Sequence, residues 1–153
     1  MQPEIKLAIV VSEFNSPLTE KMLKQALKRS AELNVLVTYV CKVPGAFDMP
    51  LTIQSLLEKE DVDAVATLGA IVQGETKHDE VIAHALAEKV ADLSLRYKKP
   101  VSLGVAGPGM TWKQAEARID DYASRSVLAA VNLAIRHREI QKPTVPAYPV
   151  VIQ

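Results

Sequence analysis

The chain has 153 residues, enough for one domain with a sizeable buried core. Its 18 Lys and Arg balance its 18 Asp and Glu, and a net charge of zero gives no indication of binding to nucleic acid or anionic membranes. The single cysteine, Cys41, excludes an intrachain disulfide and is typical of a reducing compartment. With neither a signal-peptide pattern nor a membrane-length apolar run, we expect a soluble cytoplasmic protein whose partners are small molecules or proteins.

Four apolar, β-branched runs predict buried strands at residues 5–11, 35–41, 62–67 and 101–105. Helices are expected at about 17–33, 48–58, 77–97 and 111–139. Asp48 is expected to cap the second helix, and Thr76 with Asp79 resembles a capping box for the third. A slip in the apolar phase at 119–122 predicts a bend or two abutting helices there. The chain is therefore one domain at 1–139 with a proline-rich, extended tail at 140–153.

Alternating strands and helices predict a parallel sheet with right-handed crossovers. We expect a three-layer α/β/α sandwich with a four-stranded sheet in the flavodoxin-like order 2-1-3-4. All six glycines fall in predicted loops after the second, third and fourth strands: Gly45, Gly69, Gly74, Gly104, Gly107 and Gly109. Ligands of such sheets bind beyond the carboxyl ends of the strands, where the strand order reverses. Phe14 and the loop from Gly69 to His78 should therefore share one crevice.

The loop at 68–80 has the features of a phosphate cradle. Its glycines let the backbone approach a ligand, and the unpaired N–H groups at the following helix start attract anions. His78 lies in the first turn and is suited to proton transfer near neutral pH, although an isolated histidine is more often a surface residue. No cluster has the ligand spacing of a zinc site.

The helix from Lys77 carries apolar residues over more than one stripe. Such a helix is buried on more than one side, and the surplus predicts a homo-oligomer. The apolar residues are Val81, Ile82, Ala83, Ala85, Leu86, Ala87, Val90, Ala91 and Leu93.

Five segments resemble the lumazine synthase family, in its order and spacing. They are residues 9–15 (IVVSEFN), 43–50 (VPGAFDMP), 68–78 (LGAIVQGETKH), 100–105 (PVSLGV) and 114–118 (QAEAR). The loop at 107–111 (GPGMT) is similar to the archaeal branch. The resemblance implies condensation of 5-amino-6-(D-ribitylamino)uracil with 3,4-dihydroxy-2-butanone 4-phosphate, without a metal or other cofactor. It also implies a pentamer or a shell of pentamers, with sites at subunit boundaries.

The resemblance assigns roles by position. His78 would transfer protons and Phe14 would stack on the pyrimidine, which Ala70, Ile71 and Val72 would also line. The ribityl chain would lie against Ala46, Phe47 and Asp48, and the phosphate near Gly74, Glu75 and Thr76. A neighbouring subunit would contribute Leu103, Arg118 and Arg125.

Three positions depart from the family pattern. Asp48 stands where most members have Glu, and Leu103 where many have an aromatic residue. Two lysines common after Arg118 are missing, which leaves Arg125 as the cation there. Two alternatives remain open: a riboflavin synthase of the archaeal type, and a flavin-binding or cargo-enclosing shell without catalysis. The intact 74–78 segment argues against the first, and the presence of both His78 and Arg118 argues against the second.

Overall fold

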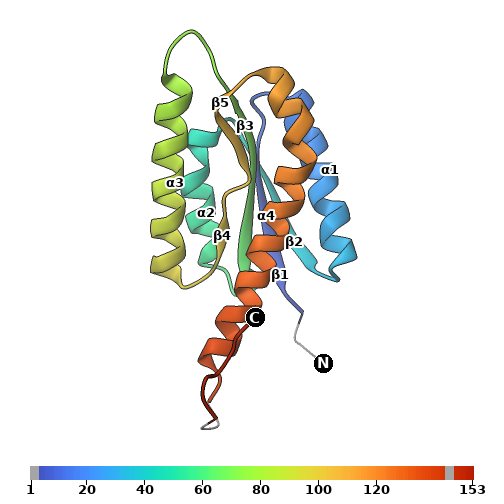
Figure 1. Cartoon of the computed structure of the whole chain (residues 1–153), viewed down its shortest axis with the longest axis vertical. Helices are drawn as coiled ribbons and strands as arrows, with labels where there is room; N and C mark the ends of the chain where they lie inside the picture. Colours follow the sequence, from blue (N-terminus) through green and yellow to red (C-terminus); the bar gives the residue numbers. More distant parts are fainter. Residues whose placement is uncertain (1–3, 144–146) are drawn as a thin grey trace.

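The computed structural model describes residues 4–143 and 147–153, which form a parallel sheet between two layers of helices (Figure 1). The strands are β1 (Lys6–Ser12), β2 (Leu36–Val43), β3 (Ala64–Val72), β4 (Val101–Ser102) and β5 (Val105–Met110). Their order is β2-β1-β3-β4, and β5 pairs in parallel with the later part of β3. The predicted flavodoxin-like order is confirmed, with the fourth strand divided into β4 and β5.

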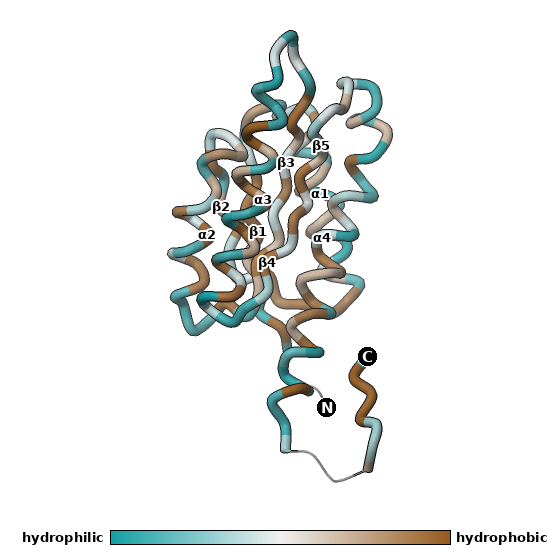
Figure 2. The backbone as a smooth tube through the Cα atoms, turned by 60° about the vertical axis from the view of Figure 1, so that its left-hand side comes forward, coloured by the Kyte–Doolittle hydropathy of each residue, from teal (hydrophilic) through white to brown (hydrophobic). Residues whose placement is uncertain are grey.

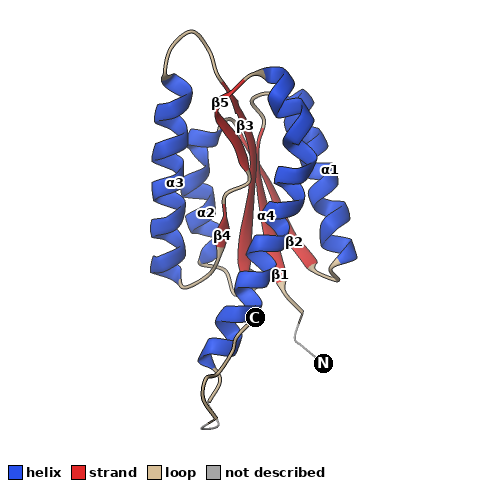
Figure 3. Cartoon of the chain, in the orientation of Figure 1, coloured by secondary structure: helices blue, strands red, loops and turns tan. Residues whose placement is uncertain are grey.

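Helices cover both faces of the sheet (Figures 1 and 3). Helices α1 (Ser16–Glu32) and α4 (Trp112–Gln141) lie on one face, and α2 (Met49–Leu57) and α3 (His78–Tyr97) on the other. A short 3-10 turn, η1 (Ala46–Asp48), precedes α2. Successive side chains of a strand point to opposite faces, and both faces of β1 are covered, which explains why it is apolar from Leu7 to Val11. Leu7, Ile9 and Val11 pack under α1 and α4, whereas Ala8 and Val10 belong to the core under α2 and α3.

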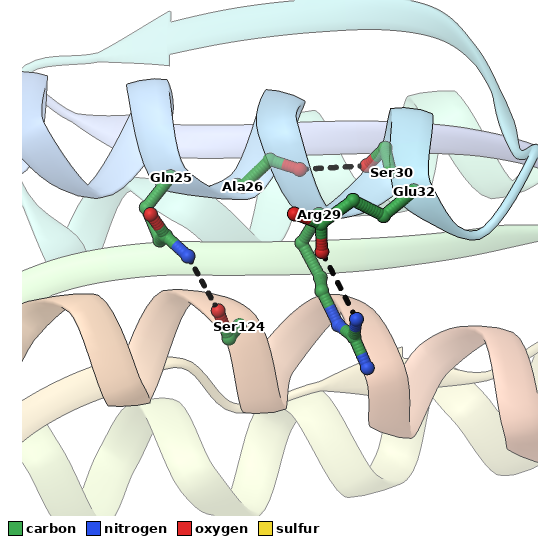
Figure 4. Close-up of polar contacts among 6 residues, drawn as sticks. All are labelled: Gln25, Ala26, Arg29, Ser30, Glu32 and Ser124. Atoms are coloured by element: carbon green, nitrogen blue, oxygen red, sulfur yellow. Dashed lines mark hydrogen bonds and ion pairs between the residues drawn. The ribbon is translucent and has the colours of Figure 1, made fainter.

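Helices α1 and α4 also contact each other directly. Gln25 donates a hydrogen bond from Nε2 to Oγ of Ser124 at 2.9 Å (Figure 4). On the α1 side, Ser30 donates to the carbonyl of Ala26 at 2.8 Å within the buried interface. The bond between Gln25 and Ser124 and the apolar residues around it hold α4 against α1 and the sheet.

Strand β3 is longer than predicted. The predicted strand ends at Thr67 and is followed by a loop from Leu68, but in the structure the strand continues to Val72. Leu68 and Ala70 are buried on the same face of the sheet, as alternate residues of a strand should be. From Gly69 onward, β5 pairs with this part of β3. A Cβ on Gly69 would lie 3.0 Å from Oγ of Ser12, so this glycine serves close packing of neighbouring strands rather than a turn.

The segment after Val105 is also a strand, although its glycines and proline predicted an irregular loop. Residues Val105–Met110 pair with β3, with a register shift between Ala70 and Val72 (Figure 3). Gly107 and Gly109 have φ of 113° and 75°, a region that glycine enters without steric penalty. The prediction that all six glycines lie in loops is therefore wrong for three of them, Gly69, Gly107 and Gly109.

Helix α4 is one continuous helix of 30 residues, so of the two arrangements expected at 119–122, a bend or two abutting helices, the second is wrong. It begins with a capping box, in which Thr111 Oγ1 accepts the N–H of Gln114 and Gln114 Oε1 accepts the N–H of Thr111. It ends at Gln141, and the apolar chain end that follows lies beyond the sheet (Figure 2). Residues 142–143 and 147–153 are not helical, as predicted for the tail, but Ile140 and Gln141 belong to α4; 144–146 lie outside the described residues. No helix in the described ranges is long and apolar enough to span a membrane.

Candidate active site

A pocket of about 450 Å³ lies beyond the carboxyl ends of β1 and β3, beside the first turns of α3. This is the edge of the sheet where the strand order reverses. The pocket brings together three segments that are far apart in the sequence. Its lining residues are Ser12, Phe14, Gly45, Ala46, Phe47, Asp48, Ala70, Ile71, Val72, Gly74, Thr76, His78, Asp79 and Ile82.

Phe14 is held at the pocket by the turn that links β1 to α1. Its N–H donates to the carbonyl of Pro44 at 2.9 Å. Asn15 has φ of 63° and donates from Nδ2 to the carbonyl of Ala70 at 2.8 Å. Asparagine is one of the few residues that enter this left-handed region readily. The backbone is therefore fixed, while the Phe14 side chain is 72% exposed and available to a ligand. Asn15 was not among the predicted site residues. Its position between a predicted strand and Pro17 is the feature of the sequence that could have indicated this turn.

The η1 turn supplies the second wall. The N–H of Asp48 donates to the carbonyl of Gly45 at 3.0 Å, which closes the turn. Ala46 is buried, whereas Phe47 is 64% exposed. Asp48 occupies the N-cap position of α2, but its side chain makes no capping hydrogen bond, so that prediction is wrong. Its carboxylate lines the pocket instead and is placed to accept hydrogen bonds from a polar ligand.

Helix α3 begins at His78, which is exposed at the pocket. The backbone N–H of His78 donates to Oγ1 of Thr76 at 3.4 Å. The predicted capping box is wrong, because Lys77 is the N-cap and Asp79 bonds elsewhere: its Oδ2 accepts the N–H of Gly109 at 2.9 Å. The start of α3 thus presents main-chain N–H groups and an imidazole to the same pocket, an arrangement suited to an anion and to proton transfer.

The sequence is similar to those of known proteins over most of its length. A family model described as 6,7-dimethyl-8-ribityllumazine synthase matches residues 4–138. The chain belongs to this family. A lumazine synthase from Saccharolobus solfataricus is 52% identical over 141 residues, 92% of both chains. Those of Metallosphaera sedula and Pyrobaculum arsenaticum are 51% and 49% identical over 138 residues, 90% of this chain and 91% and 92% of theirs. The resemblance found in the sequence is confirmed, and the function is lumazine synthase activity in riboflavin biosynthesis.

Four of the residues that the lumazine synthase resemblance named lie elsewhere in the described chain. Glu75 is exposed in the loop between β3 and α3, and Arg118 is exposed on α4. Leu103 and Arg125 line a second pocket of about 260 Å³, with Ser102, Tyr122, Ser126 and Ala129. Arg125 Nε lies 3.6 Å from Oδ2 of Asp121, an exposed pair one helical turn apart. One copy of the lumazine synthase chain therefore carries two separate groups of predicted site residues.

A buried network of hydroxyl groups fixes the second of these regions. Ser126 Oγ donates to the carbonyl of Thr67 at 2.9 Å and lies 2.7 Å from Ser102 Oγ. Thr67 Oγ1 donates to the carbonyl of Ser102 and accepts the N–H of Gly104. These bonds replace the strand pairing lost between β4 and β5, and they leave Leu103 46% exposed at the surface. The sequence analysis did not identify this network.

The described residues contain no group of three or more His, Cys, Asp or Glu side chains that could hold a metal ion.

Proposed function

We propose that the pocket at the start of α3 condenses 5-amino-6-(D-ribitylamino)uracil with 3,4-dihydroxy-2-butanone 4-phosphate. The products are 6,7-dimethyl-8-ribityllumazine, phosphate and water. One observation carries the assignment of the site: an exposed aromatic residue, a carboxylate and an uncapped helix start with an imidazole line one pocket, from three separate segments.

The pyrimidine binds between Phe14 and the apolar end of β3 at Ala70, Ile71 and Val72. Phe14 offers a flat, exposed ring on a fixed backbone, which suits stacking on a planar ligand. The ribityl chain lies along Ala46, Phe47 and Asp48, where the carboxylate accepts hydrogen bonds from hydroxyl groups.

The phosphate binds at Gly74 and Thr76, against the N-terminus of α3. Glu75 lies in the same loop and contributes through its backbone. In this position, His78 moves protons as the amine adds to the ketone, as water leaves to form the imine, and as phosphate is eliminated before ring closure. Holding both substrates lowers the barrier by several kcal/mol, on the order of 7 or more at best. Proton transfer adds roughly a hundredfold.

The complete site forms between copies of the chain, in a homo-oligomer that is a pentamer or a shell of pentamers. Leu103, Arg118 and Arg125 of one copy complete the pocket of the next, with Arg118 at the phosphate. Exposed apolar side chains support this assembly, including Val81 at 63% and Leu95 at 78% exposure on α3. Burying such residues between copies is favourable by about 25 cal/mol for each Å² removed from water.

Replacing His78 tests the proposed chemistry. His78→Ala should lower kcat roughly a hundredfold, because the proton donor and acceptor is lost. The oligomer should stay intact, because the imidazole is exposed. The measurement is lumazine absorbance and phosphate release with both substrates, together with light scattering. His84→Ala is the matched control, since His84 is exposed on the same helix and should turn over normally. Unchanged turnover in His78→Ala, or riboflavin made from lumazine alone, would refute the proposal.

A further inference from the structure

Asp79 is a buried carboxylate to which the reaction described above gives no task. It lies in the first turn of α3, one residue after His78, and is 7% exposed. A carboxylate is strongly destabilised by burial unless it is hydrogen-bonded. Its hydrogen-bond partner is the backbone N–H of Gly109, 2.9 Å from Oδ2. A charge-assisted bond of this kind is among the stronger hydrogen bonds in proteins.

Gly109 belongs to a segment that is held from two sides. Its φ of 75° is a left-handed conformation, which glycine adopts readily. A Cβ there would meet nothing within 4 Å, so the backbone conformation, and not a lack of space, favours glycine at this position. The next residue, Met110, accepts the N–H of Gln73 through its carbonyl at 2.8 Å. Thus the end of β3 holds Met110, and the first turn of α3 holds Gly109 through Asp79.

Helix α4 starts directly after this segment. Thr111 is its N-cap, and Ala115 and Ile119 are buried against the sheet, so its first turns are packed in place directly after Met110. Arg118 lies two turns into this helix. The Asp79 to Gly109 bond therefore links the element that carries His78 to the element that carries Arg118.

We infer that Asp79 is a positioning residue that sets His78 in its own pocket and, through Gly109 and α4, sets Arg118 in the pocket of a neighbouring copy. This inference rests on the proposed function, because it assigns Arg118 to a site between copies. The carboxylate acts as a hydrogen-bond acceptor that holds the two elements in register. In the oligomer, the hydrogen bond from Asp79 within each chain thereby connects that chain's own site to the site of its neighbour.

Two variants of Asp79 separate its hydrogen bond from its charge. Asp79→Ala removes the acceptor, whereas Asp79→Asn keeps an oxygen of the same reach and removes the charge. In Asp79→Ala, kcat should fall about tenfold and KM for the butanone phosphate should rise severalfold, with oligomer mass unchanged. Asp79→Asn should stay within about threefold of the parent protein in both constants. Glu80→Gln, an exposed neighbour in the same turn, should match the parent protein.

Several results would overturn the inference. Parental kinetics in Asp79→Ala would show that the bond positions nothing. Equal losses in both variants, or a lower KM for the butanone phosphate in Asp79→Asn, would show that the charge acts rather than the acceptor. Should Asp79→Ala fail to assemble, hydrogen exchange in the parent protein decides: the Gly109 N–H should exchange slowly, and exchange as fast as in exposed loops would contradict the bond.

A double variant separates this inference from the proposed function. If Asp79 acts on phosphate binding through Arg118, adding Asp79→Ala to Arg118→Ala should leave KM for the butanone phosphate at the value of Arg118→Ala alone. The loss of kcat caused by Asp79→Ala should persist, because it arises through His78. Additive increases in KM would refute the coupling while leaving the proposed function intact. Parental KM in Arg118→Ala itself would refute the role proposed for Arg118.

Discussion

At the scale of single residues, Gly104 shows how closely the backbone packs where the fourth strand divides. A Cβ at this position would lie 2.2 Å from the carbonyl oxygen of Thr67 and 2.5 Å from Cβ of Ser126. Neither atom is the end of a flexible side chain, so the strand or α4 would have to shift. The same turn brings Leu103 to the surface. The packing at Gly104 therefore determines the position of Leu103, one of the predicted site residues.

Gly104→Ala should destabilise the fold by about 1–3 kcal/mol, because the added methyl group has no space. For a chain of this size, each kcal/mol lowers Tm by about 2–4 °C. Gly74→Ala is the control: its Cβ would meet nothing within 4 Å, and its stability should change by less than about 0.5 kcal/mol. The measurement is thermal unfolding by circular dichroism. Equal Tm values for the two variants would contradict the packing argument.

Sequence order and sequence distance explain which site residues could be predicted. Phe14, the 46–48 turn and His78 each follow a strand directly, so the topology alone places them at one edge of the sheet. The bond from Asp79 joins residues 30 apart, and that from Asn15 joins residues 55 apart. Such pairs depend on the three-dimensional path of the chain. Local pattern instead indicated a capping box for Asp79, because an acid in a first turn usually serves the helix start.

At the scale of elements, strand pairing overrides local composition. Glycines predicted loops after Thr67 and Val105, yet both stretches are strands because each pairs with the other. The two abutting helices considered for α4 do not form, for a related reason. Ile119, Ala123 and Val127 are all buried on one face of α4. The apolar stripe of the helix is therefore continuous on the side that faces the sheet. Long apolar runs and helix starts were readable from the sequence, whereas the ends of strands depended on their partners.

The capping box of α4 gives a test at this scale. Thr111→Ala should destabilise the fold by about 1 kcal/mol, because the N–H of Gln114 at the helix start loses its acceptor, Oγ1 of Thr111. Thr111→Ser keeps the hydroxyl group and should stay close to the parent stability. Denaturant unfolding monitored by circular dichroism measures both. If the alanine and serine variants unfold at the same midpoint, the cap does not contribute as described.

At the scale of the whole molecule, the predicted site residues lie in separate regions of one chain. Phe14 and His78 line one pocket, whereas Leu103 and Arg125 line another, and large apolar side chains are exposed on the described surface. They include Phe14, Phe47, Val81, Leu95, Leu103, Trp112 and Leu133. The spread of apolar residues along α3 indicated an assembly before the fold was known. The sequence does not indicate which surfaces meet in such an assembly, because contacts between copies depend on surface shapes that form only after folding.

Mixed oligomers test the central claim that the site is shared between copies. His78→Ala and Arg118→Ala chains are co-expressed in equal amounts, and turnover is measured at a low concentration of the butanone phosphate, where each variant alone is weak. If His78 of one copy works with Arg118 of the next, random mixing gives about one complete pocket in four. Turnover should then recover to about a quarter of the parent value. Mixed oligomers no more active than the mean of the two pure variants would show that each pocket takes both residues from one chain.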